Sequence, residues 1–523
     1  MVVDSAKTEN TPLNNLASGA SPVLKSPLED LFQLPAFIGP ITDLVYQNTE
    51  KLGIMLDLPM DQSMYLVSFL TAILAGWALN AIKENIALRR LLSVVMGCVI
   101  QMYMYGKGFL PSIAFVIISY LIMLFFPRNQ QHKVIFIVNA FFLGAAHIHK
   151  MYYYYGFWGA EVTQVMMTNL CKISAIAINY RDGAIPKEKR DTQLKSREKE
   201  FLIETLPSFY DYLGYIYYCG GTIAGPFFEY KDFVNFIERK GHYSVIPSTI
   251  FETLKRVSHA GFFIVICDMF LAKHFTLEFL LTTEYAAWSL PMKYGYALVM
   301  LKLKIFKYYT AFCLIDSATI ASGLMYNGID EKTKKVKWNR VSTVRVWDIE
   351  FSYKVNDFLG AWNISVHMWL KYYVYLRLIK RDKKGVQIVP ILSTFIVSAI
   401  WHGFYPGYYL FFLASGIMDY IFKLGSKLWV LFDWMPQALQ RFFLFAWNYI
   451  LCAYWGLSFV FLDIGRIHKF HSALYYTGHI FLGLNFLILQ YSGIVKYCRA
   501  IEQKKLGITK TPAEAGPETK KDK

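Results

Sequence analysis

The stretch Phe395–Tyr409 places one histidine, His402, at the end of an apolar run. Gly403, Pro406 and Gly407 follow it, and these residues do not comfortably continue a regular helix. An ionisable ring at membrane depth is costly and marks a functional site, and a broken helix is tolerated there only where it is buried in protein or lines a cavity. His402 could therefore be a general base for a hydroxyl. A core histidine bonded to a backbone carbonyl is the alternative.

Asn363 is the second candidate. Its amide carries both donors and an acceptor, so it could hold a carbonyl or a hydroxyl in place. An interhelical hydrogen bond, which is common for asparagine in membranes, is the alternative interpretation. His367 lies four residues further on and would share a helix face with Asn363, as a supporting partner or a rival base. We rank His367 below His402 because no helix break adjoins it in the sequence.

A glycine-rich segment, Gly220–Tyr230, lacks the lysine and the spacing of a phosphate-binding loop. It is typical of a close-packed bend with Glu229 at its rim, and we favour a structural role for it. Other signatures are missing from the sequence: HxxxxD, the GxSxG elbow and HExxH. The seven cysteines are scattered without a CxxC pair, so neither a disulfide framework nor a metal site is predicted.

The composition is that of a membrane protein. Of the 523 residues 55% are hydrophobic and 17% aromatic, the mean hydropathy is +0.31, and the excess lies in long blocks. The net charge of +16 comes largely from loops such as Lys187–Lys199, Lys332–Arg345 and Lys380–Lys384. That is the positive-inside pattern of cytosolic loops, and it does not indicate nucleic-acid binding.

We therefore predict an all-α, polytopic integral membrane protein with about eleven transmembrane helices and additional short or re-entrant helices. A polar tail and pre-membrane segment would occupy residues 1–60, the membrane domain 61–498 and a basic tail 499–523. The candidate spans are Met64–Ile82, Leu91–Tyr105, Phe109–Phe126, Val134–Ala146, Val257–Phe275, Tyr294–Ile315, Ile388–Ile400, Tyr408–Phe422, Phe442–Phe461 and Leu474–Tyr491. Val162–Ile178 and Tyr210–Phe228 are apolar but interrupted, by Lys172 in the first case.

The two ends of the chain differ in charge. The N-terminal tail is comparatively acidic and the loop after the first span is basic, which predicts a lumenal or external N-terminus. The basic C-terminus contains Lys520 and Lys521, and this resembles the dilysine retrieval signal of endoplasmic reticulum membrane proteins, which faces the cytosol. Termini on opposite sides require an odd number of spans, and eleven is the count that we prefer.

Two segments resemble signature motifs of the membrane-bound O-acyltransferases, and in particular of the lysophospholipid acyltransferase branch. The first runs from Trp362-Asn363 through Trp369 and Tyr373 to Arg377, and the second is Ser398–Tyr409 around Trp401-His402-Gly403. Trp347-Asp348 and Gly225-Pro226 with Glu229-Tyr230 are similar to two more motifs of that branch. The Phe-Tyr-x-Asp-Trp-Trp-Asn pattern of the sterol- and diacylglycerol-acylating branch is absent.

The resemblance implies an all-helical membrane body with an internal tunnel, acyl-coenzyme A as co-substrate from the cytosolic side, a lysophospholipid acceptor from the lipid, and no further cofactor. It implies His402 as general base and Asn363 as the residue that positions the acceptor or supports the oxyanion. Further candidate substrate contacts are Trp362, Trp369, Tyr373, Arg377, Trp401 and Glu229. A family member that acylates a protein or peptide, and a transporter lined by the same polar residues, are the competing hypotheses.

Overall fold

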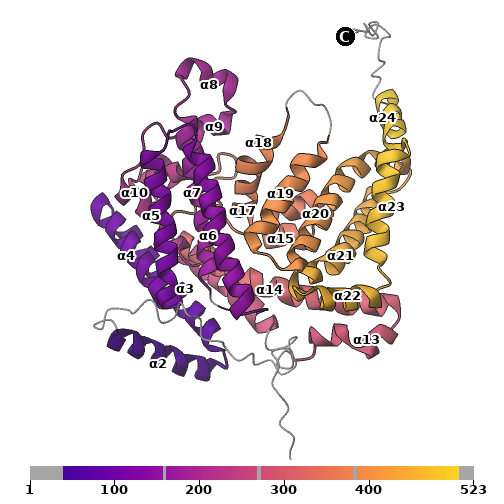
Figure 1. The fold of residues 1–523 in the computed structure, drawn as a ribbon, viewed down its shortest axis with the longest axis horizontal. Helices are drawn as coiled ribbons and strands as arrows, with labels where there is room; N and C mark the ends of the chain where they lie inside the picture. Colours follow the sequence, from indigo (N-terminus) through magenta and orange to yellow (C-terminus); the bar gives the residue numbers. More distant parts are fainter. Residues whose placement is uncertain (1–38, 157–158, 160, 268–272, 381–385, 506–523) are drawn as a thin grey trace, which may run out of the picture.

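The structure is a computed structural model that describes residues 39–156, 159, 161–267, 273–380 and 386–505 (Figure 1). Several features predicted from the sequence lie outside these residues. They are the N-terminal tail before residue 39, residues 268–272 of the predicted span Val257–Phe275, most of the loop Lys380–Lys384, and the C-terminal Lys520 and Lys521.

The described chain is mostly helical, with one short β-hairpin. Its first half contains α2 (Gly39–Leu56), α3 (Met60–Ala81), α4 (Ile86–Tyr105), α5 (Phe109–Phe125), α6 (Gln131–Tyr153), α7 (Val162–Asp182), α8 (Lys187–Gln193), α9 (Ser196–Phe201), α10 (Phe209–Ile216), α11 (Tyr230–Ile237) and α12 (Ile250–Ile264). The middle contains α13 (Thr283–Ala287), α14 (Leu290–Ser322), a hairpin of β1 (Tyr326–Ile329) and β2 (Val336–Trp338), α15 (Val346–Glu350) and α16 (Val355–Ala361).

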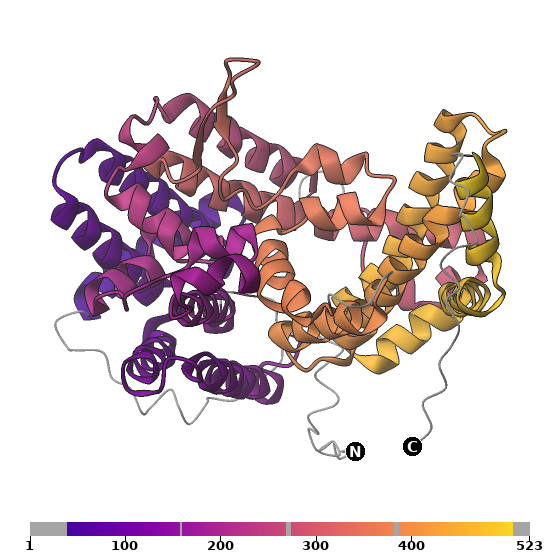
Figure 2. The same cartoon turned by 90° about the horizontal axis from the view of Figure 1, so that it is seen from above.

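The last third carries both predicted chemical residues. It contains α17 (Ile364–Trp369), a π-helical turn at Leu370–Tyr375, α18 (Leu376–Leu378), α19 (Ile388–His402), α20 (Pro406–Gly425), α21 (Gln437–Phe461), α22 (Ile464–Ala473), α23 (Thr477–Tyr491) and α24 (Ile494–Lys505). In both views the orange helices at the start of this group lie beside the purple helices of the first half, and the yellow helices at its end lie on the side of the molecule away from the indigo ones (Figure 2).

Two hydrophobic cores hold the helices together. One is formed mainly by α5, α6, α7, α10 and α11, and the other by α12, α14, α20 and α21. The long helix α14 contributes to both, since Ile320 near its C-terminal end packs in the first core and Met300 and Ile315 in the second. α14 therefore ties the two halves of the molecule into one body.

Four described helices, α3, α4, α6 and α21, are long and apolar enough to cross a membrane. α22 and α23 together would form a fifth span that is bent by 84°, and the apolar helices α5 and α19 are shorter. The predicted span Leu474–Tyr491 missed this bend. The eleven predicted spans exceed what helix length and composition identify, and that number stays a prediction.

Two predicted segments are more extensive in the structure. The segment Val162–Ile178, whose apolar run Lys172 interrupts, forms the continuous and largely buried helix α7. The Lys172 ammonium is fully buried and donates to the carbonyls of Tyr215 and Ile216 at 3.2 and 3.1 Å, at the end of α10. A buried cation with such partners does not disrupt a helix. The predicted span Tyr294–Ile315 is likewise only part of the 33-residue α14.

Candidate active site

The helix break predicted next to His402 is confirmed. α19 ends at His402, Gly403 follows with φ +124° and ψ −164°, and α20 begins at Pro406. The His402 ring stacks on Phe412 at 5.1 Å between ring centroids and meets the ring of Phe459 edge-on at 5.1 Å. The break thus places the imidazole at the end of a helix, in contact with the rings of Phe412 and Phe459.

The ring nitrogens of His402 have no hydrogen-bond partner among the described residues, and the side chain is partly exposed. Burial between Phe412 and Phe459 would normally be matched by a partner for each polar atom. The alternative interpretation of His402, a histidine satisfied by a backbone carbonyl, does not describe it. Its imidazole remains available to a hydroxyl.

A second histidine, His147 of α6, fits that alternative description. It is 4% exposed, and its Nε2 lies 3.1 Å from the carbonyl oxygen of Trp401. A carbonyl only accepts, so Nε2 carries the hydrogen and donates. The carbonyl lies in the last turn of α19, where no later backbone N–H of the same helix is available to bond it. Sequence analysis missed His147, although a histidine inside an apolar span was a usable signal.

Asn363 stands at the N-terminus of α17 in a left-handed backbone conformation, with φ +38° and ψ 55°. This conformation is uncommon for any residue other than glycine, although asparagine tolerates it better than most. Such outliers persist where the surroundings enforce them, and they cluster at functional sites. The Ser365 hydroxyl donates to the Asn363 side-chain oxygen at 3.4 Å, which leaves the amide hydrogens for another acceptor.

No helix break directly adjoins His367, as the ranking below His402 assumed. α17 runs through it and continues without interruption into the π-helical turn at Leu370 and then into α18. The backbone N–H of His367 donates to the Asn363 carbonyl at 2.9 Å, so the two residues share the first turn of the helix.

An aromatic cluster lies beside Asn363. The ring of Trp362 contacts Tyr308 and Phe312 of α14, with centroids 5.6 and 5.5 Å apart. Tyr408, whose ring centroid is 5.6 Å from that of His402, lies near Tyr308. The aromatic surroundings of Trp362 and of His402 therefore adjoin through these two tyrosines.

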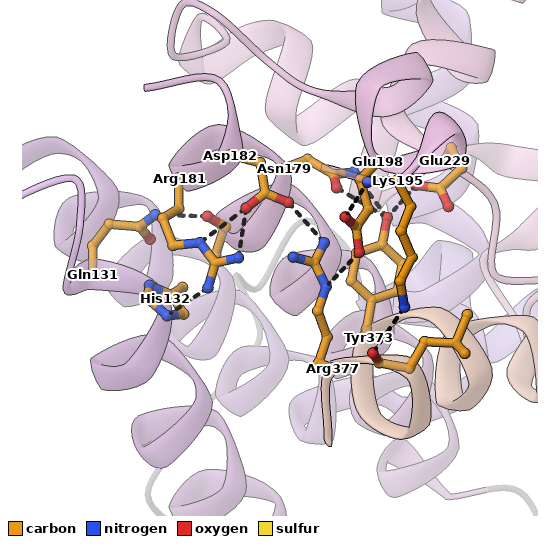
Figure 3. A network of polar contacts seen from close by, with 12 residues as sticks. Gln131, His132, Asn179, Arg181, Asp182, Lys195, Glu198, Glu229, Tyr373 and Arg377 are labelled. Carbon is orange, nitrogen blue, oxygen red and sulfur yellow. Dashed lines mark hydrogen bonds and ion pairs between the residues drawn. The ribbon is translucent and has the colours of Figure 1, made fainter. Parts of the chain in front are cut away.

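Glu229 is not at a rim, as the sequence suggested, but 3% exposed inside a polar network (Figure 3). The Tyr373 hydroxyl donates to its carboxylate at 2.6 Å, and Arg197 pairs with it at 3.0 Å. Asn179 donates to the Tyr373 oxygen at 2.9 Å. Burial raises the pKa of the Glu229 carboxyl, while Arg197 and Tyr373 act in the opposite direction. Buried and satisfied in this way, Glu229 joins α7, α9 and the π-helical turn.

Arg377 belongs to the same network and is held by carboxylates. It pairs with Asp182 at 2.7 Å and with Glu198 at 3.4 Å. A small pocket lined by Arg197, Tyr373 and Arg377, among others, opens here. This network occupies the end of the molecule where α8, α9 and α18 lie (Figure 1).

Two of the predicted substrate contacts use their indole N–H groups to hold α7. Trp369 donates to the Ser174 hydroxyl at 2.9 Å, and Trp401 donates to the Met167 carbonyl at 2.8 Å. Both side chains are buried. Substrate contact through their rings stays a prediction.

The sequence analysis also missed Glu350 of α15. Its carboxylate pairs with Lys302 at 2.6 Å and accepts from the Tyr309 hydroxyl at 2.8 Å, both on α14. These contacts fix α15 and the chain that leads to Trp362 against α14. Within the described ranges, no three His, Cys, Asp or Glu side chains lie close enough together to hold a metal ion.

The described chain is thus a mainly helical body in which His402 ends a broken helix and Asn363 precedes α17 in a left-handed conformation. The chain belongs to the membrane-bound O-acyltransferase family, which residues 131–465 match. That range includes Glu229, Asn363 and His402.

Three relatives show which part of the family is similar. The chain is 29% identical to human membrane-bound glycerophospholipid O-acyltransferase 2, over 84% of this chain and 86% of the relative. It is 31% identical to lysophospholipid acyltransferase 2 of Arabidopsis thaliana, over 69% of this chain and 79% of the relative. It is 29% identical to the lysophospholipid acyltransferase of Schizosaccharomyces pombe, over 69% of this chain and 72% of the relative.

Proposed function

We propose that this protein is a lysophospholipid acyltransferase that transfers a fatty acyl group from acyl-coenzyme A to the free hydroxyl of a lysophospholipid. The family and the names of the relatives support the reaction class. The observation that carries the chemistry is the His402 ring, which ends a broken helix and whose nitrogens have no hydrogen-bond partner among the described residues.

In this mechanism His402 takes the proton from the glycerol hydroxyl as the oxygen attacks the thioester carbonyl. The resulting oxyanion is stabilised by the Asn363 amide N–H, whose position the left-handed backbone fixes. Collapse of the tetrahedral intermediate breaks the carbon–sulfur bond, and the proton on His402 passes to the departing thiolate. Holding both lipids in place would supply much of the rate gain.

The remaining parts of the proposal concern the path of the substrates and the topology. We place the two reacting groups in a tunnel through a body of eleven spans, with the acyl donor entering at the end where α8, α9 and α18 lie. The basic loop Lys380–Lys384, which joins the two motifs, is a candidate for the coenzyme A phosphates. Weaker donor binding on its neutralisation supports this role, and an unchanged donor KM removes it.

The proposed location is the endoplasmic reticulum membrane, with the C-terminus and the Lys520–Lys521 signal in the cytosol. Figure 1 supports opposite sides for the two ends, since α2 and α24, the first and last described helices, lie at opposite ends of the molecule. Replacing both lysines by serine and following the protein by microscopy tests the retrieval signal.

Release of coenzyme A by the purified protein tests the reaction. One unsaturated acyl-coenzyme A is supplied with a panel of lysophospholipids that differ in headgroup, and His402→Ala is run beside wild type. His468→Ala is a matched control, because His468 is exposed on α22. We expect acceptor-dependent release that falls about 10²–10⁴-fold in His402→Ala and is unchanged in His468→Ala.

Near wild-type turnover in folded His402→Ala would refute the role of His402. If no lysophospholipid supports coenzyme A release, the acceptor hypothesis changes to a protein or peptide. The same assay tests this with a peptide in place of the lipid. Flux across proteoliposomes without an acyl donor would favour the transporter hypothesis instead.

A further inference from the structure

Asp316 of α14 is a fully buried carboxylate that the proposed reaction leaves without a role. Its Oδ1 accepts from the backbone N–H of Thr343 at 2.9 Å and from the Thr343 hydroxyl at 2.8 Å. Its Oδ2 accepts from the Ser342 hydroxyl at 3.3 Å and pairs with Arg256 of α12 at 3.5 Å. Both oxygens are therefore engaged, which favours a fixed structural charge over an ion-conducting group.

The residue that Asp316 holds is in turn bonded to the start of α17. The Thr343 carbonyl accepts from the backbone N–H of Ile364 at 2.8 Å, directly after Asn363. On the other side of Asn363, the Arg345 N–H donates to the Ala361 carbonyl at 3.1 Å. The chain at 343–345 thus bonds to residues on both sides of Trp362-Asn363.

These contacts explain how Asn363 keeps its conformation. A residue in a sparsely populated backbone region costs about 1–3 kcal/mol and persists only where the surroundings enforce it. The bonds at Ala361 and Ile364 fix the chain on either side of Asn363. Asp316 anchors the segment that makes these bonds, and α14 and α12 bury the anchor.

We propose that Asp316 is a positioning residue for Asn363 and that it acts through Thr343. The inference rests on the proposed function for its kinetic consequence, because it assumes that Asn363 orients a reacting group. Asp316 touches no reacting atom. Its loss would let the 342–345 segment move and release Asn363 toward an ordinary backbone conformation.

The kinetic expectation follows from this route. A misplaced orienting group lowers kcat rather than the affinity for substrates, and displacement by about 1 Å can reduce a rate roughly 10²-fold. Asp316→Ala and Thr343→Val should therefore lower kcat by about ten- to a hundredfold with little change in either KM. Thr343→Ser keeps the hydroxyl and should restore most of the activity.

The matched control is Asp419→Asn on α20. Asp419 is also a buried carboxylate, but its partner is Lys423 and no contact joins it to the 342–345 segment in the described chain. It should keep wild-type kcat. In an Asn363→Ala background, Asp316→Ala should cost no further activity, because the residue through which it acts is gone.

Hydrogen exchange of the full-length protein in detergent gives a readout that does not need turnover. In Asp316→Ala and Thr343→Val the amides of Thr343 and Ile364 should lose protection, while those of α21 keep it. Unchanged protection of both amides, or a loss of kcat that adds in full to that of Asn363→Ala, would overturn the inference. A wild-type protein without acyltransferase activity would refute the proposed function alone, since the exchange result would still test the Asp316 contacts.

Discussion

Replacing Gly403 by alanine should displace His402. Gly403 has φ +124° and ψ −164°, a region that only glycine occupies without strain. A Cβ built on it would lie 3.2 Å from both Cγ and Nδ1 of His147. Alanine at position 403 is therefore destabilised in two ways. Its backbone is strained, and its Cβ contacts the His147 ring, which is held in place by its hydrogen bond to the Trp401 carbonyl.

The backbone strain alone amounts to about 1–3 kcal/mol. If the chain relieves it by moving the end of α19, the whole amount appears as lost transition-state stabilisation, which corresponds to about a 5- to 150-fold fall in kcat/KM. The assay is coenzyme A release with the preferred lysophospholipid, normalised to folded protein. If the backbone of Gly403→Ala keeps the strained conformation, the strain instead lowers the stability of the fold, and the thermal unfolding midpoint of the same samples measures that loss.

Two comparisons make the experiment decisive. Gly483→Ala on α23 adds a methyl group where no atom lies within 4 Å and the backbone φ is not positive, so activity should be unchanged. The double variant Gly403→Ala with His147→Ala removes the contact with the imidazole but not the backbone strain, so it should recover only part of the loss. Wild-type kinetics and an unchanged unfolding midpoint in Gly403→Ala would refute this reasoning.

Two further predictions concern buried donors. His147→Gln keeps an N–H that can reach the Trp401 carbonyl, whereas His147→Leu leaves that buried carbonyl unsatisfied at a cost of about 1–3 kcal/mol. Steady-state kinetics should therefore give the glutamine variant the higher kcat. Equal kcat values would exclude a role for the His147–Trp401 hydrogen bond in holding the end of α19. Arg89 is fully buried and donates to the carbonyls of Leu79, Ile82, Phe236 and Ile237. Arg89→Met should destabilise the fold by more than about 3 kcal/mol, seen as a lower unfolding midpoint. Arg90→Met breaks only partly exposed ion pairs, which are worth about 0–1 kcal/mol.

Local chemistry made the break at His402 predictable. Gly403 and Pro406 carry their conformational preferences in the sequence, and the structure ends α19 and begins α20 at those residues. The apolar blocks likewise predicted most of the long helices, because the hydrophobicity of a segment can also be read from the local sequence. Their ends were less predictable, because α6 and α14 continue through charged residues, such as Lys150 and Lys293, that tertiary contacts accommodate.

Features that depend on distant parts of the chain were not predictable in this way. The chain on both sides of Asn363 is bonded to a distant segment, through Ile364 to Thr343 and through Ala361 to Arg345, and nothing in the local sequence indicates these contacts. Glu229 was predicted at the rim of a close-packed bend, the Gly220–Tyr230 segment. It is buried because Arg197, Tyr373 and Asn179 reach it from three other segments.

The same contacts separate residues that hold the frame from residues that can react. Arg377, Glu229 and Tyr373 all have protein partners, so a substrate that binds them must first replace an internal hydrogen bond or ion pair. His402 has no such partner among the described residues, and a hydroxyl can reach its imidazole without breaking a bond. The reacting proton must go to a group that is free to accept it, which is consistent with the proposed role of His402. The side chain of the rival base His367 likewise has no hydrogen-bond partner in the described chain, so the two histidines are separated by comparing His402→Ala with His367→Ala.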